Sequence, residues 1–459
     1  MKNYKKVKIG LLLFVTCILV GCGNTGETDK ADDGESVKTF SDWAEHEVFQ
    51  DVPAMLLEET RIGKSTDYGA GTYVIDVRGT SLDDYRSYLT LLEEQGFEKY
   101  ADNGTEGVDG CVFTSTYTKD KKVLTITHMV KTNMTYISAS EEMNLSTHLF
   151  YKDEYVANNV EGATTSLHLL ELHTYGDSYV IRMKNGKFIL VDGGMEQDAR
   201  YLLDYLESLV PKGEKPVIEG WFVTHGHNDH IGAFAAFADN AKYAERIVVE
   251  GVYFTEPSKA VCINYGIDIS DVKYGTLACR ASDGKPTKVY RPQTGQRYYF
   301  NDITIDILHT QEQLLLDEYD NGFNDTSSWL LFTIDGQTFL DAGDASEGAI
   351  NVVKRTYNQE FFNLDMLSVF HHGQNVYDSY VNYFNYKTAI YPTFVVGSQT
   401  AGHREEENVV LQQNAVECIS WGDGTKVLTF PYKLGTAESR PMREWIYTPD
   451  RKTPVPYSQ

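Results

Sequence analysis

Three histidines and an aspartate fall within six consecutive residues of this 459-residue chain, at His225, His227, Asp229 and His230. Imidazole nitrogens and a carboxylate that meet at one turn suit borderline-soft divalent metals, zinc above all. The chain has only 12 histidines, so a chance occurrence of this pattern is on the order of one in a thousand. The spacing therefore predicts a metal centre rather than a surface loop that happens to carry histidines.

The residues around this motif indicate how it is held. The apolar run Gly220–Val223 is typical of a strand, Gly226 lets the chain turn tightly, and the segment from Ile231 onward is able to start a helix. We therefore expect the ligands to lie in a connection between a strand and a helix.

The pattern His-x-His-x-Asp-His is the signature of the metallo-β-lactamase superfamily, and residues 166–432 resemble that superfamily. Leu190–Gly194 looks like part of its opening strands, and Asp192 matches the buried carboxylate behind its metal site. The resemblance implies an α/β fold, the αββα sandwich, over residues 160–435, with residues 436–459 as a C-terminal extension.

Two later stretches resemble the parts of the superfamily that complete the metal site. Thr338–Asp344 resembles the stretch that ends in the metal-bridging aspartate, which would be Asp344. Leu367–Gly373 resembles the strand whose terminal histidine is a ligand, so His371 and His372 are both candidates.

Three short motifs indicate a branch of the superfamily. The turn Gly176-Asp177-Ser178, the pair Gly343-Asp344 and the run His371-His372-Gly373 resemble most the extracytoplasmic hydrolase domain of the competence DNA-uptake channel. Its secreted relatives, which include teichoic-acid phosphorylcholine esterases, share this resemblance.

One departure from the superfamily pattern is visible. Many of its hydrolases have a further histidine after the strand near residue 309, whereas Asn321–Thr326 contains none. The competence-type branch also lacks that histidine, so we interpret the absence as a mark of the branch. His309 precedes the gap and is expected to be structural.

The residue types then imply roles. His225 and His227 would hold one metal, Asp229 and His230 the other, and Asp344 would bridge them. Two cations roughly 3.5 to 4 Å apart lower the pKa of a bridging water and clamp the oxygens of a phosphoryl transition state. The expected cofactors are two divalent ions, zinc in the first place and manganese as an alternative.

The other candidates adjoin these ligands. Asp192 is expected to orient a ligand histidine. Because His371 and His372 are adjacent at a strand end, their side chains should point to opposite sides, so that one binds metal and the other donates a proton or hydrogen bond. Which of them is the ligand stays open. His403, just beyond the turn at residues 397–402, could also face the cleft, and Asp229 is a candidate catalytic residue together with His371 and His372.

Strands and helices alternate through the second half of the chain. The patterns predict strands at Ser166–Leu172, Ser178–Arg182 and Lys187–Val191, and helices at Ala199–Leu209 and Gly232–Ala241. This alternation favours a layered α/β sandwich.

The first half predicts a small α+β accessory domain at residues 41–145. A strand at Gly71–Arg78 is followed by a helix with a capping box at Ser81 and Asp84 and a stop at Gly96. Three β-rich runs follow, at Cys111–Thr118, Val123–Val130 and Met134–Ala139. The domain contains no cluster of catalytic residue types, so a structural role is favoured over ligand binding.

The N-terminus has the form of an export signal. Four lysines precede the apolar run Ile9–Val20, and Leu19-Val20-Gly21-Cys22 resembles the bacterial lipobox, in which the cysteine is acylated and becomes the mature N-terminus. Residues 1–22 would then be a lipoprotein signal peptide and residues 23–40 a flexible linker. The alternative is an ordinary cleaved signal. We expect a lipid anchor at Cys22 in the cell membrane and an extracytoplasmic location.

The charge limits the partners. Removing residues 1–22 takes away four lysines and no acidic residue, so the formal net charge of −25 becomes −29. Long nucleic acid is therefore disfavoured as a partner, because its phosphate backbone is bound by basic surfaces.

These observations lead to one main functional hypothesis, a lipid-anchored extracytoplasmic dinuclear metal-dependent hydrolase. The branch resemblance favours a small-molecule or cell-envelope phosphate ester or phosphodiester as substrate. A metal-dependent amide or lactone hydrolase is an alternative, as is a non-catalytic surface lipoprotein that binds a ligand.

Overall fold

A computed structural model of the chain describes residues 43, 46–55, 61–62, 66–67, 71–141, 143–257, 261–262, 278–314, 322–374, 376–394 and 405–441. The predicted signal peptide with Cys22, the linker at 23–40 and His403 lie outside the described residues, as does most of the C-terminal extension. None of the described helices combines the length and the apolar composition needed to span a bilayer.

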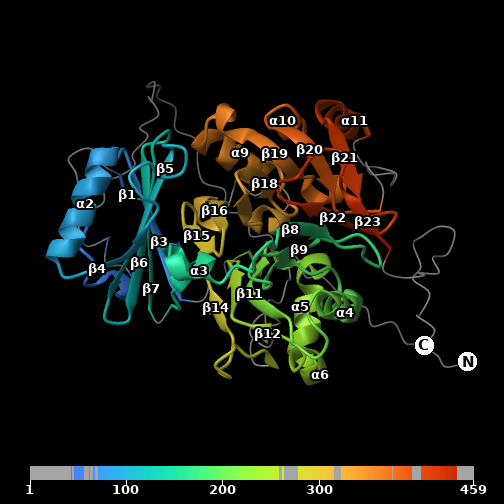
Figure 1. Ribbon diagram of the computed structural model, residues 1–459. Coiled ribbons are helices and arrows are strands. Elements are labelled where there is room, and N and C mark those ends of the chain that lie inside the picture. Colours follow the sequence, from blue (N-terminus) through green and yellow to red (C-terminus); the bar gives the residue numbers. More distant parts are fainter. Residues whose placement is uncertain are drawn as a thin grey trace, which may run out of the picture. The chain divides into compact units, whose positions relative to one another are not determined.

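An antiparallel sheet, here called the N-terminal sheet, forms first along the chain. Its strand order is β1-β3-β7-β6-β5-β4, and β2 pairs with β3. The strands are β1 (Arg61–Ile62), β2 (Thr66–Asp67), β3 (Thr72–Arg78), β4 (Glu98–Asp102), β5 (Val112–Lys119), β6 (Lys122–Met129) and β7 (Met134–Glu141). Helix α2 (Leu82–Glu94) covers one face of this sheet (Figure 1). A 3-10 turn, η1 (Glu47–Phe49), belongs to the same apolar core.

The capping box predicted for α2 is confirmed. The Asp84 backbone N–H donates to Ser81 Oγ at 3.1 Å, and the Ser81 N–H donates to Asp84 Oδ2 at 2.8 Å. This arrangement satisfies two N–H groups that the first turn leaves without helical partners. The side chains of Tyr85, Tyr88 and Leu92 bury the apolar stripe of the helix against the sheet.

Two larger sheets pack face to face in the rest of the chain. The first has the order β14-β13-β11-β10-β9-β8-β22-β23, with β12 beside β11. Its strands are β8 (Ser166–Leu169), β9 (Ser178–Arg182), β10 (Phe188–Asp192), β11 (Val217–Val223), β12 (Val248–Val249), β13 (Gly251–Phe254), β14 (Lys288–Tyr290), β22 (Thr425–Thr429) and β23 (Glu438–Arg440).

The second sheet of this sandwich runs in sequence order from β15 to β21. Its strands are β15 (Arg297–Phe300), β16 (Ile303–His309), β17 (Trp329–Ile334), β18 (Gln337–Asp341), β19 (Asn363–Ser368), β20 (Asn385–Tyr391) and β21 (Glu417–Ser420). The buried side chains of both sheets, among them Phe222 and Phe332, share one hydrophobic core.

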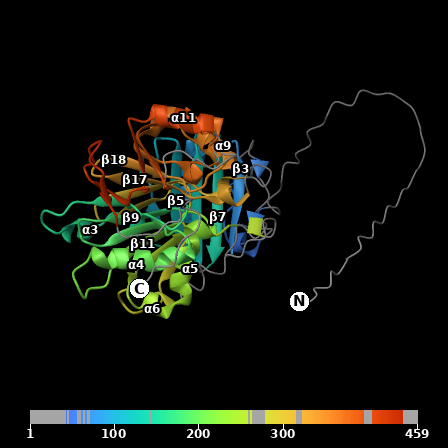
Figure 2. The same ribbon diagram turned by 90° about the vertical axis from the view of Figure 1, so that its right-hand side faces the viewer.

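Helices cover the outer faces of the two sheets, so the layers are α, β, β and α (Figure 2). On the first sheet lie α4 (Ala199–Ser208), α5 (Asn228–Asp239) and α6 (Ala241–Ala244). On the second lie α9 (Glu347–Thr356), α10 (Asp378–Val381) and α11 (Glu405–Asn414). The fold is thus the αββα sandwich that the sequence predicts. The short elements are η2 (Thr147–Leu149), α3 (Asp153–Ala157), η3 (Glu196–Asp198), η4 (Gln311–Gln313), η5 (Gly322–Thr326), η6 (Gln359–Phe362) and η7 (Phe370–Gly373).

The two sheets mirror each other in one respect that positions the site. In each, antiparallel strands give way to parallel ones: β10 and β11 are parallel in the first sheet, and β18 and β19 are parallel in the second. Parallel neighbours end at the same edge of a sheet, and ligands commonly bind beyond the carboxyl ends of such strands. A functional site is therefore expected at the residues that follow β10, β11, β18 and β19.

The N-terminal sheet contacts the sandwich through polar side chains. Thr114 Oγ1 donates to the Thr294 carbonyl at 3.0 Å, and Asn103 Nδ2 donates to the Gly295 carbonyl at 3.0 Å. Thr114 lies between Phe113 and Ser115, which face α2, as the alternation of a strand requires. The sheet therefore presents one face to α2 and the other to the sandwich.

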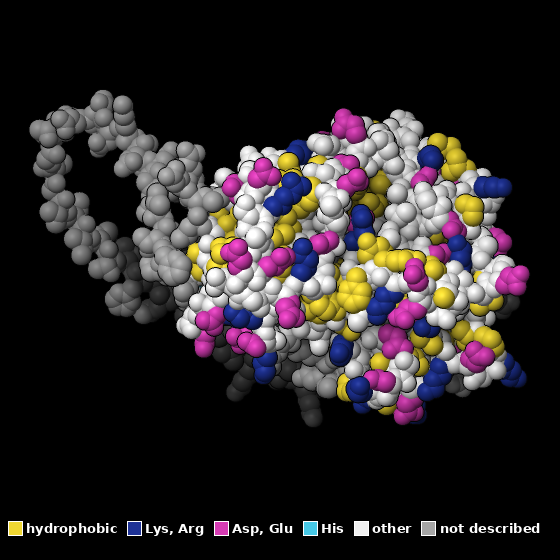
Figure 3. Space-filling model, turned by 60° about the vertical axis from the view of Figure 1, so that its left-hand side comes forward, with side chains coloured by type: hydrophobic (Ala, Val, Ile, Leu, Met, Phe, Trp, Pro, Cys, Tyr) yellow, Lys and Arg dark blue, Asp and Glu magenta, His cyan; other side chains and the backbone are white. Residues whose placement is uncertain are grey.

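The surface carries both signs of charge. On the face shown in Figure 3, basic side chains are interspersed with acidic ones.

Candidate metal centre

The His-x-His-x-Asp-His motif occupies the connection between β11 and α5, as the sequence predicts. The strand ends at Val223, His227 is the N-cap of α5, and Asp229 and His230 lie in the first helical turn. The helix begins very close to η3, because a Cβ atom at Gly232 would lie 2.7 Å from the backbone nitrogen of Glu196. Glycine at this position lets the helix bring its ligands to the edge of the sheet.

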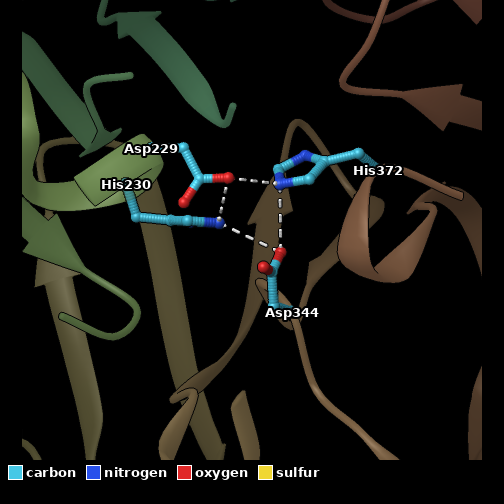
Figure 4. A group of neighbouring side chains, drawn as sticks. All are labelled: Asp229, His230, Asp344 and His372. Atoms are coloured by element: carbon cyan, nitrogen blue, oxygen red, sulfur yellow. Dashed lines mark ion pairs between the residues drawn. The ribbon is translucent and has the colours of Figure 1, made fainter. Parts of the chain in front are cut away.

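Four ligand-type side chains converge in one group: Asp229, His230, Asp344 and His372 (Figure 4). Nε2 of His230 lies 3.0 Å from Asp344 Oδ1, and Nε2 of His372 lies 3.2 Å from both Asp344 Oδ1 and Asp229 Oδ2. His230 Nε2 lies 4.0 Å from Asp229 Oδ2. Two imidazoles and two carboxylates thus surround one small volume.

A second group consists of His225, His227 and Asp344. His225 Nε2 lies 3.0 Å from His227 Nδ1 and 3.7 Å from Asp344 Oδ2. Asp344 therefore faces the first group with Oδ1 and the second with Oδ2. This arrangement is what a carboxylate shared between two cations requires.

Several buried atoms in these groups fit a bound cation. Among the described residues, His230 Nε2, His372 Nε2 and Asp344 Oδ1 are inaccessible to solvent and have no hydrogen-bond partner. Leaving such an atom unsatisfied costs about 1–3 kcal/mol. Nitrogen and carboxylate oxygen atoms at these positions are the donors that zinc and similar divalent metals accept.

Asp192 holds one ligand in place from behind. Its Oδ2 lies 2.7 Å from His230 Nδ1, which donates to it, and its Oδ1 accepts from the Thr224 N–H at 2.7 Å. Because Asp192 engages the Nδ1–H of His230, Nε2 is the nitrogen that faces the cluster, and it becomes a ligand when a metal displaces its proton. Burial alone would lower the pKa of His230, but the carboxylates of Asp344 and Asp192 outweigh it and raise that pKa well above its ordinary value.

Burial favours the neutral form of three histidines of the cluster. Burial lowers the pKa of His225 well below its ordinary value, and burial likewise lowers the pKa of His227 and His371. Metal ligation requires a neutral imidazole. For Asp344, burial would raise the pKa, but His230 and His372 lower it well below the ordinary value, so this carboxylate is ionised and available.

A row of further buried carboxyl groups lies behind the cluster. Burial raises the pKa of Asp341 to about 7, with the charge of Asp192 adding to the effect. Burial also raises the pKa of Asp177 well above its ordinary value. The Gly176-Asp177 turn lies directly against the motif, because the Asp177 N–H donates to the Asp229 carbonyl and a Cβ atom at Gly176 would lie 2.7 Å from the same oxygen.

The expectation that His371 and His372 point to opposite sides is wrong. Nε2 of His371 lies 3.5 Å from Asp344 Oδ2, and Nε2 of His372 lies 3.2 Å from Asp344 Oδ1. The strand ends at Ser368, and both histidines adopt left-handed backbone angles, φ 52° and φ 55°. Because the chain turns here instead of continuing as a strand, the alternation of side chains does not apply, and both rings reach the same aspartate.

Two further histidines considered in the sequence analysis are His309 and His403. His309 is fully buried, its Nδ1 lies 3.0 Å from Gln313 Oε1, and it belongs to no metal-ligating group of the described residues. His403 lies outside the described residues.

Three residues of the site are not among those predicted. The Thr224 hydroxyl donates to Asp192 Oδ2 at 2.6 Å. Nδ2 of Asn324 lies 3.5 Å from Nδ1 of His371. The Tyr175 ring lies beside that of His372, with centroids 6.1 Å apart. Tyr175 is 47% exposed. A signal existed for Thr224, which directly precedes the motif, and for Asn324, which lies where the superfamily histidine is missing. Nothing in the sequence distinguishes Tyr175.

Comparison with known families agrees with this site. Residues 173–276 match the family described as the Metallo-beta-lactamase superfamily. The matched segment includes the whole motif from His225 to His230 and ends before Asp344. This segment of the chain is thus similar to that superfamily, and the αββα layers are the arrangement expected of such a domain.

Solved structures give weaker likenesses. A mutant of the HARLDQ-motif metallo-beta-lactamase from Cronobacter sakazakii is 14% identical over 44% of this chain and 74% of its own, with a TM-score of 0.28. A second structure of the HARLDQ-motif enzyme is 15% identical over 42% of this chain and 66% of its own, also with a TM-score of 0.28. At such low scores these likenesses give no information on the fold or function of this chain. No curated protein matches the sequence.

The likeness of residues 173–276 to the superfamily and the two His/Asp groups together indicate a metal-binding site. The groups fit divalent metals in donor type and burial. The arrangement can activate water and stabilise negative charge that develops on a substrate.

Proposed function

We propose that the protein is a dinuclear metal-dependent hydrolase of a phosphate ester or phosphodiester. The observation that carries the proposal is Asp344, whose two oxygens face separate groups, with His230 and His372 on Oδ1 and His225 and His371 on Oδ2. A single-metal centre would not need a buried carboxylate with a set of histidines on each oxygen.

Charge supports an anionic substrate. With neutral histidines, Asp229 and Asp344 bring two negative charges to the two groups, and Asp192 adds a third behind His230. Two divalent cations would leave a net positive centre, which stabilises a phosphate better than a neutral amide or lactone. This argument places the amide or lactone hydrolase second.

When bound, the metal pair would supply Lewis acidity to a phosphoryl oxygen and to water. Side chains of the protein orient the ligands and contact the substrate. Asp192 and Thr224 fix the orientation of His230, so the ligand cannot rotate away. His371 lies at the margin of the cluster with 15% of its side chain exposed, where it can donate a hydrogen bond or proton to the leaving oxygen. Tyr175 lies at the rim beside His372, where it can contact the substrate.

The test is a hydrolysis screen. Full-length protein in detergent, loaded with zinc or manganese, should hydrolyse p-nitrophenyl phosphate or bis-p-nitrophenyl phosphate, and Asp344→Ala should not. A lactam and a lactone serve as comparison substrates. Turnover of these and of no phosphoester would reject the proposed substrate class, and absence of bound metal would favour the non-catalytic binding lipoprotein.

We also propose that Cys22 is acylated and holds the enzyme at the outer side of the cell membrane. The lysines, the apolar run and the lipobox-like end of residues 1–22 support this proposal. Radiolabelled palmitate should be incorporated into the wild type and not into Cys22→Ala. Label in that variant would instead point to an ordinary cleaved signal with acylation elsewhere.

A further inference from the structure

Asn324 occupies a position next to the second metal-ligating group. It lies in η5, its side chain is 3% exposed, and its Nδ2 lies 3.5 Å from His371 Nδ1. The Asn324 side chain also lies against that of His227. A polar side chain that is buried against two histidines of the cluster belongs to the site geometrically.

The carboxamide oxygen of Asn324 has no hydrogen-bond partner among the described residues, and it is inaccessible to solvent. A buried acceptor without a donor is costly and rare in folded proteins. Rotation about the last side-chain bond exchanges the oxygen and the nitrogen of a carboxamide, so either atom can face the histidines. A metal ion bound beside His227 would supply a partner for this oxygen.

The surrounding turn fixes this side chain. The Ser327 N–H donates to the Asn324 carbonyl at 3.1 Å, and the adjacent Asp325 accepts from the Ala349 N–H at 3.0 Å, which ties η5 to the start of α9. The Phe323 ring lies 5.2 Å from that of His227, centroid to centroid. Asn324 thus approaches the cluster from a turn that is anchored on both sides.

The two ligand groups differ in number. Asp229, His230, Asp344 and His372 provide four donors, whereas His225, His227 and Asp344 provide three. We propose that the carboxamide oxygen of Asn324 is the fourth protein ligand at the group formed by His225, His227 and Asp344. This inference rests on the dinuclear centre of the proposed function.

The chemistry of the ligand makes the two sites unequal. A carboxamide oxygen is neutral and harder than an imidazole nitrogen, and carbonyl oxygen suits Mn²⁺ and Mg²⁺ better than Zn²⁺. The site with Asn324 should therefore bind zinc more weakly than the site with two histidines and two carboxylates. Metal should bind in two separable steps.

The experiment measures zinc binding to full-length protein in detergent, by competition with a chromophoric chelator and by elemental analysis after dialysis at fixed free zinc. The wild type should bind two zinc ions, the second more weakly. Asn324→Ala should weaken the second step by at least about tenfold and leave the first unchanged. Asn324→His should tighten the second step by about tenfold or more, because imidazole replaces the weak ligand.

Asn103→Ala is the matched control, because it removes a buried carboxamide that bonds Val112 and Gly295 outside the cluster. It should leave both zinc affinities unchanged. Visible absorption of the cobalt-substituted proteins gives an independent readout, since the band of the second cobalt should change in both Asn324 variants.

The outcomes separate the two proposals. A wild type with two zinc ions whose second step is the same in Asn324→Ala and Asn324→His overturns the ligand assignment and leaves the dinuclear hydrolase standing. A wild type that binds one zinc ion overturns the dinuclear centre and the assignment together. If Asn324→Ala does not fold, the tightening expected in Asn324→His decides the matter alone.

Discussion

Asp344 concentrates the electrostatics of the cluster in one side chain. It is 2% exposed, and His230, His372 and His371 together lower its pKa although burial would raise it. Removal of this carboxylate takes a charge from both ligand groups at once. Asp192, by contrast, contacts the cluster through His230 and Thr224.

The first prediction compares these two aspartates. Asp344→Ala should lose both metals under conditions where the wild type keeps them, and with them all measurable turnover. Asp192→Asn should weaken metal binding by about 10- to 100-fold, because it loosens one ligand without removing it. Elemental analysis and kcat measure both effects. Equal losses in the two variants would contradict the assignment of Asp344 to both groups.

The second prediction separates the adjacent histidines. His372 lies 3.2 Å from both Asp229 and Asp344 and belongs to the four-residue group, whereas His371 is the more exposed of the two. His372→Ala should therefore lose one metal per chain. His371→Ala should keep its metal and lose about 10²- to 10⁴-fold in kcat if it transfers a proton to the leaving group. Loss of metal in His371→Ala would reverse the two roles.

At the scale of single residues, the sequence allows the prediction of ligands that lie close together along the chain. His225, His227, Asp229 and His230 are recognisable because one strand-turn-helix connection carries them all. Asn324 could be marked only as a gap in a pattern, since its contact with His227 depends on how η5 folds back against the motif. The shared orientation of His371 and His372 could not be predicted, because it follows from two left-handed residues after the strand.

At the scale of elements, alternation predicts the central strands well. The predicted strand Ser178–Arg182 coincides with β9, and the predicted helix Ala199–Leu209 corresponds to α4 (Ala199–Ser208). The strand β4 is not predicted, because its side chains are mostly exposed and show no apolar period. Buried strands carry a pattern in their side chains, whereas an edge strand such as β4 is defined largely by its neighbour.

The third prediction concerns the end of β16. His309 is fully buried, and burial lowers its pKa from the ordinary 6.5 to about 4. The unfolded chain therefore binds a proton more readily than the folded chain between these pH values. Stability from this group is complete above pH 6.5 and is lost as pH falls toward 4, by about 3 kcal/mol in all.

His309→Gln removes this titration and keeps a polar side chain of similar reach. Urea unfolding of metal-free protein should show a smaller loss of stability between pH 6.5 and pH 4.5 in the variant than in the wild type. Metal-free protein is used because acid also protonates the ligand histidines. The release of metal would then lower stability independently of His309. The same pH dependence in both proteins would mean that the protonation of His309 is not linked to unfolding.

At the scale of the whole molecule, the N-terminal sheet and the sandwich belong to one compact unit. The sequence predicts two folded regions, and the patterns within each are visible. The contact between them is not visible, because threonine side chains on a strand are typical of a solvated face. Thr114, Thr116 and Thr127 instead hydrogen-bond residues 294–296.

The fourth prediction tests whether that contact stabilises the fold. Gly295 has φ +84°, and a Cβ atom there would collide with the Thr114 hydroxyl and lie 2.8 Å from Val112 Cγ1. Gly336, in the turn between β17 and β18, has a similar φ of +78°, and a Cβ atom there would have nothing within 4 Å. Substitution of either glycine by alanine should strain the backbone to a similar extent. Only at Gly295 would the added Cβ also collide with the N-terminal sheet.

Gly336→Ala should cost about 1–2 kcal/mol, the penalty of a left-handed alanine. Gly295→Ala should cost that amount and a further 1–3 kcal/mol, roughly, for the collision with the N-terminal sheet. The free energy of unfolding in urea measures both, and a single transition in each variant would show that the two parts unfold together. Equal costs in the two variants would show that the sheet moves aside without loss. In that case the polar contact would contribute little to stability, and the N-terminal sheet would be free to serve another purpose.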